Sequence, residues 1–443
     1  MVACFFFVRK IELHNKYKAA IIITAVLFTS WILSLSSQNN IRPNMESTFF
    51  VGKNVLLNDG IFGIGAGNFS RAWQLYRPQS VISSQYFGYD FNLGSDTMGT
   101  FFVTIGIVGL VAFLILVLSA LYSTYISYRQ SNRGTKEHTI LGLLTLVLLY
   151  FALVSWTVPL SYAMLVVWMV ISGLGLAKAK LSEYHPSKKL AIIMIPLAVL
   201  LIVNSAITIQ KSRAFSVFSK AQSVQQGDLA LPLFAQATSL YKFDGFYRAE
   251  VEYMIQLNRN LVSNTTLPQD ELKSKYIMNA SSSIDAGLQA VSANRNNYQN
   301  YVSLGRAYEL IIPFNKDEGY APAKKAYEEA VKLYPENPYL YVMLARLEAS
   351  VGSKDGVRIQ LTEALKKKQN FADALYLMSQ LEASDNQIDG ALSYAIEAVK
   401  NAPNDPLVYI QAGLLYYGKK DYQNAVSALS TALQKDPNNA NVA

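Results

Sequence analysis

Alternating glycines mark the segment whose backbone could bind an anion. Gly63, Gly65 and Gly67 are followed by Asn68, within the run Asp59–Phe69. Successive backbone N–H groups in a glycine-rich loop can cradle a phosphate. A tight re-entrant turn at a membrane surface needs the same residues, because glycine adopts the positive φ angles of such turns. Both interpretations stay open. A dinucleotide-binding fingerprint is not indicated, because no soluble βαβ pattern surrounds the glycines.

Arginines close to this loop could bind an anionic group. Arg71 and Arg77 follow the glycines, and Arg42 precedes them. A guanidinium group binds phosphate oxygens through paired, charge-assisted hydrogen bonds. The same arginines could instead anchor the loop at a membrane interface, since Trp73 and Tyr76 lie between them. The arginines are therefore candidate residues for binding an anionic substrate group.

Carboxylates offer the only acid or base chemistry on this loop, and no catalytic residue is assigned. Asp90 and Asp96 could act as a general acid or base, or they could be solvated loop carboxylates. His14, His138 and His185 all lie in segments predicted below to face the cytoplasm. The single cysteine, Cys4, excludes an intramolecular disulfide and a zinc site built from thiolates. We expect no metal and no cofactor.

The loop is expected to be held in place by membrane-spanning helices on either side of it. A membrane-spanning helix needs about 20 apolar residues, and about five stretches of residues 1–210 meet or approach that length. The loop, residues 38–98, lies between the first and second stretches. The predicted spans are Ala19–Ser37, Gly99–Ser127, Thr139–Val158, Leu160–Ala177 and Leu190–Ile209.

The distribution of charge predicts how the chain is threaded. The whole chain has a formal net charge of +8, but residues 211–443 contain 24 basic and 24 acidic residues, so the excess lies in residues 1–210. Basic clusters precede the first span and lie between spans two and three and between spans four and five. By the positive-inside rule these segments are cytoplasmic. The N-terminus is then cytoplasmic, and the loop and everything after Ile209 are extracytoplasmic. Because the basic residues flank apolar segments, nucleic acid is not an expected partner.

Residues 297–443 repeat with a period of 34. Small residues recur where two helices would approach closely, tyrosines recur where neighbouring repeats would meet, and prolines recur where the second helix would end. The pattern resembles the tetratricopeptide (TPR) repeat, which implies an α-solenoid of helix hairpins that binds proteins in a groove. Residues 211–296 are interpreted as degenerate helical repeats. The repeating positions are Tyr341, Leu375 and Tyr409; Val357, Ala391 and Ala425; Ala364, Ala398 and Ala432; and Gln369, Pro403 and Pro437, with an upstream copy running from Tyr301 to Pro335.

The order of motifs around the loop resembles the O-antigen ligase/polymerase family of bacterial envelope proteins. A glycine-alternating segment ending in Phe69 leads through Tyr76-Arg77-Pro78 to a helix containing Gly106-Ile107-Val108-Gly109. The resemblance covers residues 20–210. It implies an enzyme that transfers glycan from an undecaprenyl-diphosphate carrier on the outer face of the inner membrane. In that chemistry arginines hold the diphosphate leaving group, so the resemblance makes Arg71, Arg77 and Arg42 the candidate substrate-binding residues of a diphosphate clamp. Family members have more spans, so the chain resembles such a protein truncated at its N-terminus.

The sequence therefore predicts an all-α, multi-pass inner-membrane protein with an extracytoplasmic TPR domain. Its expected function is transfer of lipid-linked glycan, with the repeats binding protein partners. The alternative is a non-catalytic, membrane-anchored TPR adaptor or scaffold of the cell envelope. The adaptor is favoured by the missing spans and by Asn92–Asp96, which contains no histidine where the family often has one. A further departure from the family is Gly60, which replaces the usual proline.

Overall fold

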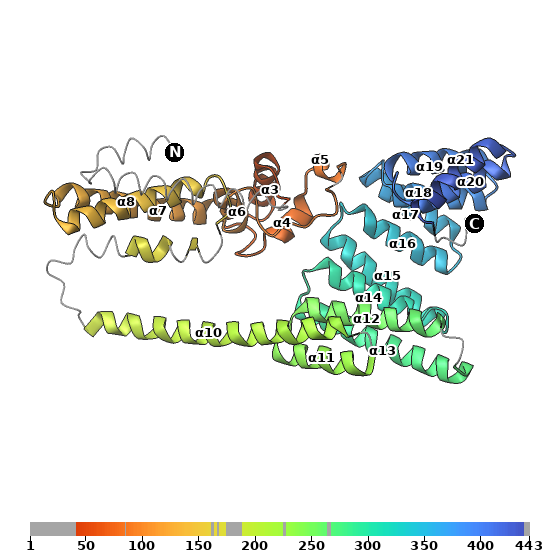
Figure 1. Cartoon of the computed structure of the whole chain (residues 1–443), viewed down its shortest axis with the longest axis horizontal. Coiled ribbons are helices and arrows are strands. Elements are labelled where there is room, and N and C mark those ends of the chain that lie inside the picture. The colour runs from red at the N-terminus through yellow and green to blue at the C-terminus, as the bar shows by residue number, and fades with distance from the viewer. Residues whose placement is uncertain are drawn as a thin grey trace. The chain divides into compact units, whose positions relative to one another are not determined.

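The computed structural model describes residues 41–437, except for residues 85, 161–163, 166–167, 174–187, 225–226 and 264–266. For residues 188–202, 204–205 and 227–228 only the backbone is described. Every regular element in the described part of the chain is a helix, as the all-α prediction requires. The chain divides into two compact units, one made of residues 1–78 and 89–195 and the other of residues 79–88 and 196–443. Figure 1 labels the helices.

Five helices with described bounds build the first unit. Asn44 caps the first of them by accepting a hydrogen bond from the Ser47 N–H at 2.7 Å. The sequence predicted one apolar stretch over Gly99–Ser127, and this prediction is wrong in one respect, because the helix is broken at Ile105–Gly106. The helices are α3 (Met45–Asn58), α4 (Phe69–Tyr76), α6 (Thr97–Thr104), α7 (Gly106–Gln130) and α8 (Lys136–Val154).

Two helices in the described part of the chain, α7 and α8, are long and apolar enough to cross a membrane. They cover most of the second and third predicted spans. The predicted span Ala19–Ser37 lies outside the described residues, and Leu160–Ala177 lies partly outside them. The stretch Leu190–Ile209 lies within α10 (Lys188–Ser223), a single helix of 36 residues. Five spans therefore remain a prediction, of which two have the expected helices.

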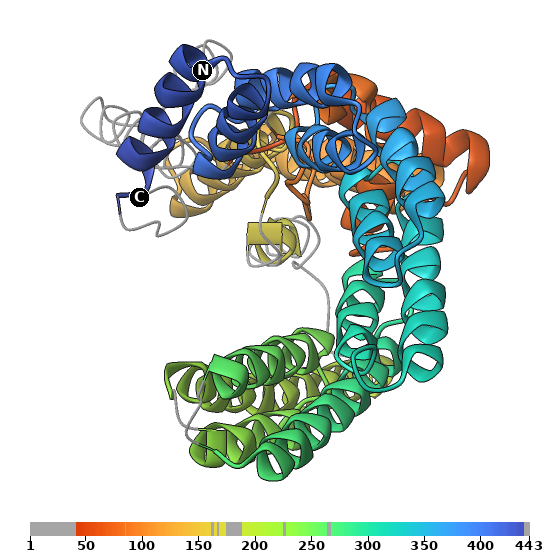
Figure 2. The same ribbon diagram turned by 90° about the vertical axis from the view of Figure 1, so that its right-hand side faces the viewer.

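The second unit is a row of antiparallel helix hairpins (Figure 2). We call the first helix of each of the last four hairpins an A helix and the second a B helix. The A helices are α14 (Tyr298–Glu309), α16 (Pro338–Ser350), α18 (Ala372–Ser384) and α20 (Pro406–Gly418), and the B helices are α15 (Lys316–Leu333), α17 (Lys354–Lys367), α19 (Ile388–Asn401) and α21 (Tyr422–Lys435). Preceding them are α11 (Gly227–Leu240), α12 (Asp244–Ser263) and α13 (Gln269–Ala293).

Small residues let the two helices of each hairpin approach closely, as the 34-residue period predicts. The B-helix alanines at 330, 364, 398 and 432 are all completely buried. A methyl group on Gly305 would lie 2.6 Å from the Tyr327 ring, and one on Gly413 would lie 2.7 Å from Leu429. Helices α15, α19 and α21 each end two residues before Pro335, Pro403 or Pro437. The hairpins are therefore of the TPR type.

The short segment Gln79–Gly88, which contains α5 (Gln79–Ile82), belongs to the second unit. It packs where α17 leads into α18. The Lys368 Nζ donates to the Ser84 carbonyl at 2.9 Å and lies 3.8 Å from the centroid of the Phe87 ring. Burial lowers the pKa of Lys368. A run of three lysines at a helix end is typical of a solvated surface, but Lys368, the last of the run, is only 7% exposed.

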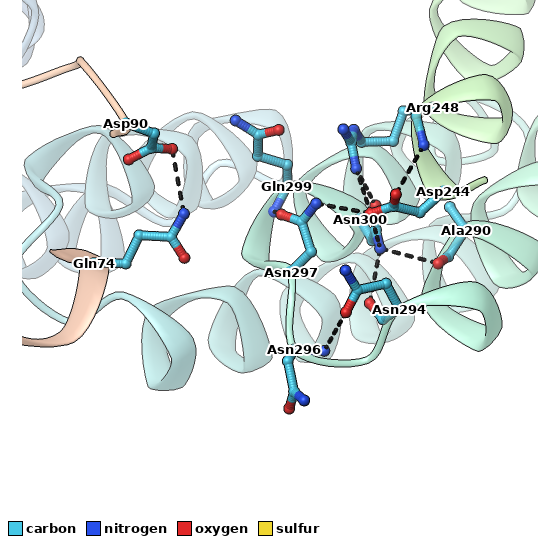
Figure 3. Close-up of polar contacts among 11 residues, drawn as sticks. Gln74, Asp90, Asp244, Arg248, Ala290, Asn294, Asn296, Asn297, Gln299 and Asn300 are labelled. Atoms are coloured by element: carbon cyan, nitrogen blue, oxygen red, sulfur yellow. Dashed lines mark hydrogen bonds and ion pairs between the residues drawn. The ribbon is translucent and has the colours of Figure 1, made fainter. Parts of the chain in front are cut away.

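A buried polar network joins α12 to the start of the last four hairpins (Figure 3). The Asp244 carboxylate accepts hydrogen bonds from Arg248 (2.8 Å), Asn297 (2.8 Å) and Asn300 (3.1 Å). The Asn300 amide also donates to the carbonyls of Ala290 and Asn294. The equivalent positions of the next three A helices hold buried Leu340, Ala374 and Val408. Asn300 is thus a polar residue at a position that is otherwise apolar.

We expect Asp244→Ala to destabilise the second unit by about 2 kcal/mol, because it removes the acceptor of three hydrogen bonds, from Arg248, Asn297 and Asn300. The measurement is thermal unfolding of the full chain in detergent, followed by circular dichroism. The matched control is Asn296→Ala, an exposed change in the neighbouring turn, which should leave the transition unmoved. Equal melting of both variants would contradict a stabilising role for the network.

Candidate functional site

The glycine loop closes the break between α6 and α7. The Ile64 N–H donates to the Val103 carbonyl at 3.1 Å, and the Gly65 N–H donates to the Thr104 carbonyl at 2.8 Å. The Val108 N–H donates to the Ile61 carbonyl at 3.4 Å. A helix break leaves carbonyls and N–H groups without partners, which is costly in an apolar layer. The loop supplies these partners.

This geometry corresponds to a tight turn. Gly63, Gly65, Gly67 and Gly106 all have positive φ angles, between 66° and 105°. Two of the N–H groups that could have faced a phosphate donate to helix carbonyls instead. Asn68 bonds within the loop, because its side-chain amide donates to the Ile64 carbonyl at 3.2 Å. A role for the loop in binding phosphate stays a prediction.

A small cavity lies beside the loop in the first unit. Its volume is about 100 Å³, and its lining is mostly apolar. Three threonines on one face of α6 contribute to it, and their hydroxyl groups donate hydrogen bonds to backbone carbonyls. The cavity therefore presents few free polar groups to a ligand. Its lining includes Ala66, Gly67, Thr97, Thr100 and Thr104.

Arg77 lies in the interior of the first unit. Its side chain is completely buried and forms an ion pair with Asp90 at 2.8 Å. Its guanidinium carbon lies 5.4 Å from the centroid of the Trp73 ring, a favourable cation–π arrangement. Gln74 donates to the other Asp90 oxygen at 3.3 Å (Figure 3). Binding a diphosphate through Arg77 would require this buried pair to open.

The other two candidate arginines are more accessible. Arg71 lies on α4 and is half-buried, whereas Arg42 is exposed and lies before α3. Near Arg71 the Tyr76 hydroxyl donates to Asp59 at 2.9 Å. Burial and this hydrogen bond raise the pKa of Tyr76 to about 12, and the positive charge of Arg71 opposes the rise. Arg71 is therefore the clamp candidate on α4 that a ligand can reach without breaking a buried ion pair.

Asp96 caps a helix. Its carboxylate accepts a hydrogen bond from the Gly99 N–H at 2.7 Å at the start of α6, and a second from the Ser95 hydroxyl. Only 4% of the residue is exposed. The interpretation of Asp96 as a solvated loop carboxylate is therefore wrong. An aspartate at this position fits the N-cap preference of helices, a signal that the order Asp96-Thr97-Met98-Gly99 already carried.

The repeats carry a second candidate surface, which we call the A-helix face. It consists of Glu309 on α14, Arg346 on α16, and Asp373 and Tyr376 on α18. Burial raises the pKa of the Glu309 and Asp373 carboxyls, and the positive charge of the exposed Arg346 opposes the rise in both. Three consecutive A helices therefore place charges within electrostatic reach of one another, with both carboxyls partly desolvated.

Sequence analysis did not predict the A-helix face. It located the positions that bury residues between helices, because those positions repeat. The residues of the A-helix face differ from one repeat to the next, so no period marks them. The sequence did carry one signal: Arg346 follows the repeating Tyr341 at the same offset at which Gln380 follows Leu375, and both are exposed on A helices.

Comparison with known proteins supports no assignment beyond the fold. No protein-family model matches the chain, and no curated protein matches it. Among solved structures, MamA is 22% identical, covering 38% of this chain and 88% of its own, with a TM-score of 0.29. YrrB, described as a TPR protein with an unusual peptide-binding site, is 18% identical. The match covers 49% of this chain and 97% of YrrB, with a TM-score of 0.29. PilW, a type IV pilus biogenesis factor, is 13% identical. The match covers 54% of this chain and 96% of PilW, with a TM-score of 0.37.

We expect Gly106→Ala to disrupt the first unit more than Gly67→Ala does. Both glycines have positive φ, so each substitution adds about 1–2 kcal/mol of backbone strain. Only at Gly106 would the new methyl group also meet backbone, 2.2 Å from the Ile61 carbonyl oxygen; at Gly67 nothing lies within 4 Å. Limited trypsin digestion of the purified chain in detergent measures the difference. Equal digestion of the two variants would contradict this account of the loop.

Proposed function

We propose that the chain is a membrane-anchored TPR scaffold of the bacterial envelope, whose repeats bind a protein partner outside the inner membrane. The TPR-type hairpins and two helices suited to a membrane support this proposal. The distribution of basic residues supports an extracytoplasmic position for the repeats. A TPR array is a common scaffold for binding extended peptides and helices.

The observation that carries the proposal is the A-helix face. Burial raises the pKa of both Glu309 and Asp373, and Glu309 accepts one hydrogen bond, from the Tyr327 hydroxyl at 2.6 Å. A partner that supplies hydrogen-bond donors or a positive charge would stabilise the ionised carboxylates. Arg346 between them can bind a carboxylate of the same partner. The face is therefore suited to a polar, charged segment.

We expect a photo-crosslinking amino acid placed at Arg346 or Gln380 to capture a protein in intact membranes. Both positions are exposed on A helices. The matched control position is Lys332, an exposed B-helix residue, where no specific product should form. The products are separated by electrophoresis and identified by mass spectrometry. Identical products at all three positions, or none at Arg346 and Gln380, would count against the scaffold.

A second candidate function is transfer of glycan from an undecaprenyl-diphosphate carrier. It is supported by the resemblance over residues 20–210 and by the accessibility of Arg71 and Arg42. In this candidate Arg71 and Arg42 hold the diphosphate leaving group. Arg77 would hold the loop in its folded form through its ion pair with Asp90.

If the second candidate is correct, Arg71→Ala should lower glycan transfer about 10-fold to 100-fold, which corresponds to the loss of one or two charge-assisted hydrogen bonds. Transfer from a purified undecaprenyl-diphosphate oligosaccharide is measured with the full chain in liposomes. Arg133→Ala, an exposed change in the α7–α8 turn, is the control and should keep full activity. Activity that is absent from the unmodified chain, or unchanged by Arg71→Ala, would reject the clamp.

A further inference from the structure

The repeats of this chain show what covers the outer side of a B helix. Helix α15 packs on α16, α17 packs on α18, and α19 packs on α20. Each of these three B helices is therefore covered by the A helix of the following hairpin. Because the hairpins are related by a period of 34 residues, the residues that meet at the three interfaces can be compared position by position.

The first two interfaces are joined by ion pairs. On α15, Lys324 pairs with Glu348 of α16 at 2.8 Å. At the equivalent positions 34 residues later, Arg358 of α17 pairs with Glu382 of α18. Burial of the glutamates is close to complete, with 4% and 6% of each residue exposed. A cation on the B helix is thus matched by a buried glutamate on the next A helix.

The third interface uses apolar residues at the same two positions. Leu392 of α19 replaces the cation, and Tyr416 of α20 replaces the glutamate. Both pack on one cluster, formed by Ala391, Ala395, Ala412 and Leu415. The chemistry of the two positions therefore changes together, from an ion pair to an apolar contact.

Helix α21 repeats the apolar version, and no helix in the described part of the chain covers it in the way that α20 covers α19. Its residues Tyr422, Val426 and Leu433 are equivalent to Ile388, Leu392 and Val399 of α19. The α19 residues are half-buried by α20. The α21 residues are 57%, 65% and 37% exposed. They lie at spacings of four and seven, which places them on one face of the helix.

We propose that this face of α21 is a docking site for an amphipathic helix of a partner protein, of the same kind as α20. The bound helix would place small residues like Ala412 against α21, with an apolar or aromatic residue at the position of Tyr416. A helix of the α16 or α18 kind, with glutamate at that position, would be rejected, since Val426 offers no positive charge to a buried carboxylate. This inference rests on the proposed scaffold function and names a second surface of the same repeats.

The test uses a fluorescent peptide of residues Asp405–Gly418 with a C-terminal lysine tail, titrated with the full chain in detergent and followed by anisotropy. We expect saturable binding, and about tenfold weaker binding by the peptide carrying Tyr416→Glu. The Val426→Arg variant of the chain should reverse this preference, because it restores the cation found in α15 and α17. Ser427→Arg, an exposed change on a different side of α21, is the control and should keep the original preference.

Three results would overturn the proposal. One is no binding of the α20 peptide by the full chain. Another is equal binding of the peptide and its Tyr416→Glu form. The third is a dimer of the unmodified chain, seen by light scattering and abolished by Val426→Arg but not by Ser427→Arg, because a second copy would then occupy the face. Crosslinking at Arg346 does not depend on α21, so the scaffold can hold even where this inference fails.

Discussion

The close approach of two helix backbones inside each hairpin is the constraint on which the repeat unit depends. On the A helices the position of closest approach holds Gly305, Ala345, Ser379 or Gly413, none larger than serine. The facing B-helix alanines are completely buried. With the backbones this close, only small residues fit between the two helices, and the larger side chains lie against the next hairpin or in solvent. Those side chains are free to vary, and the surfaces that distinguish this array are built from them.

What the sequence predicted in the repeat unit follows from that constraint. Small residues, tyrosines and prolines recur because every hairpin solves the same packing problem, so the helix pairs and the ends of α15, α19 and α21 could be predicted without a structure. The exceptions could not. Asn300 replaces an apolar residue because Asp244, 56 residues earlier, reaches it, and Lys368 is buried because a segment 284 residues away covers it. Pairings over such distances leave no local pattern.

In the first unit the sequence predicted which segments are apolar helices, but not how the chain bends and bonds between them. Apolar stretches of sufficient length predicted the two helices suited to a membrane. The break at Gly106 was not predicted, because the residues around it are as apolar as those of an unbroken helix. The glycines indicated a tight turn, but the partners of its N–H groups lie about 40 residues further along the chain. The three arginines looked alike in the sequence, and only burial separates Arg77, paired with Asp90, from Arg71 and Arg42.

The change from ion pairs to apolar contacts along the array bears on how such an array can lengthen by gene duplication. A copy of the hairpin α20–α21 added after α21 would bring a tyrosine to Val426, as Tyr416 comes to the cluster that holds Leu392. A copy of α16–α17 in the same place would bury the equivalent of Glu348 beside Val426 with no cation. Hairpins that look interchangeable by their period are therefore not interchangeable in order. A copy of α16–α17 fits directly after α17, where Arg358 would meet its glutamate, but it does not fit after α21.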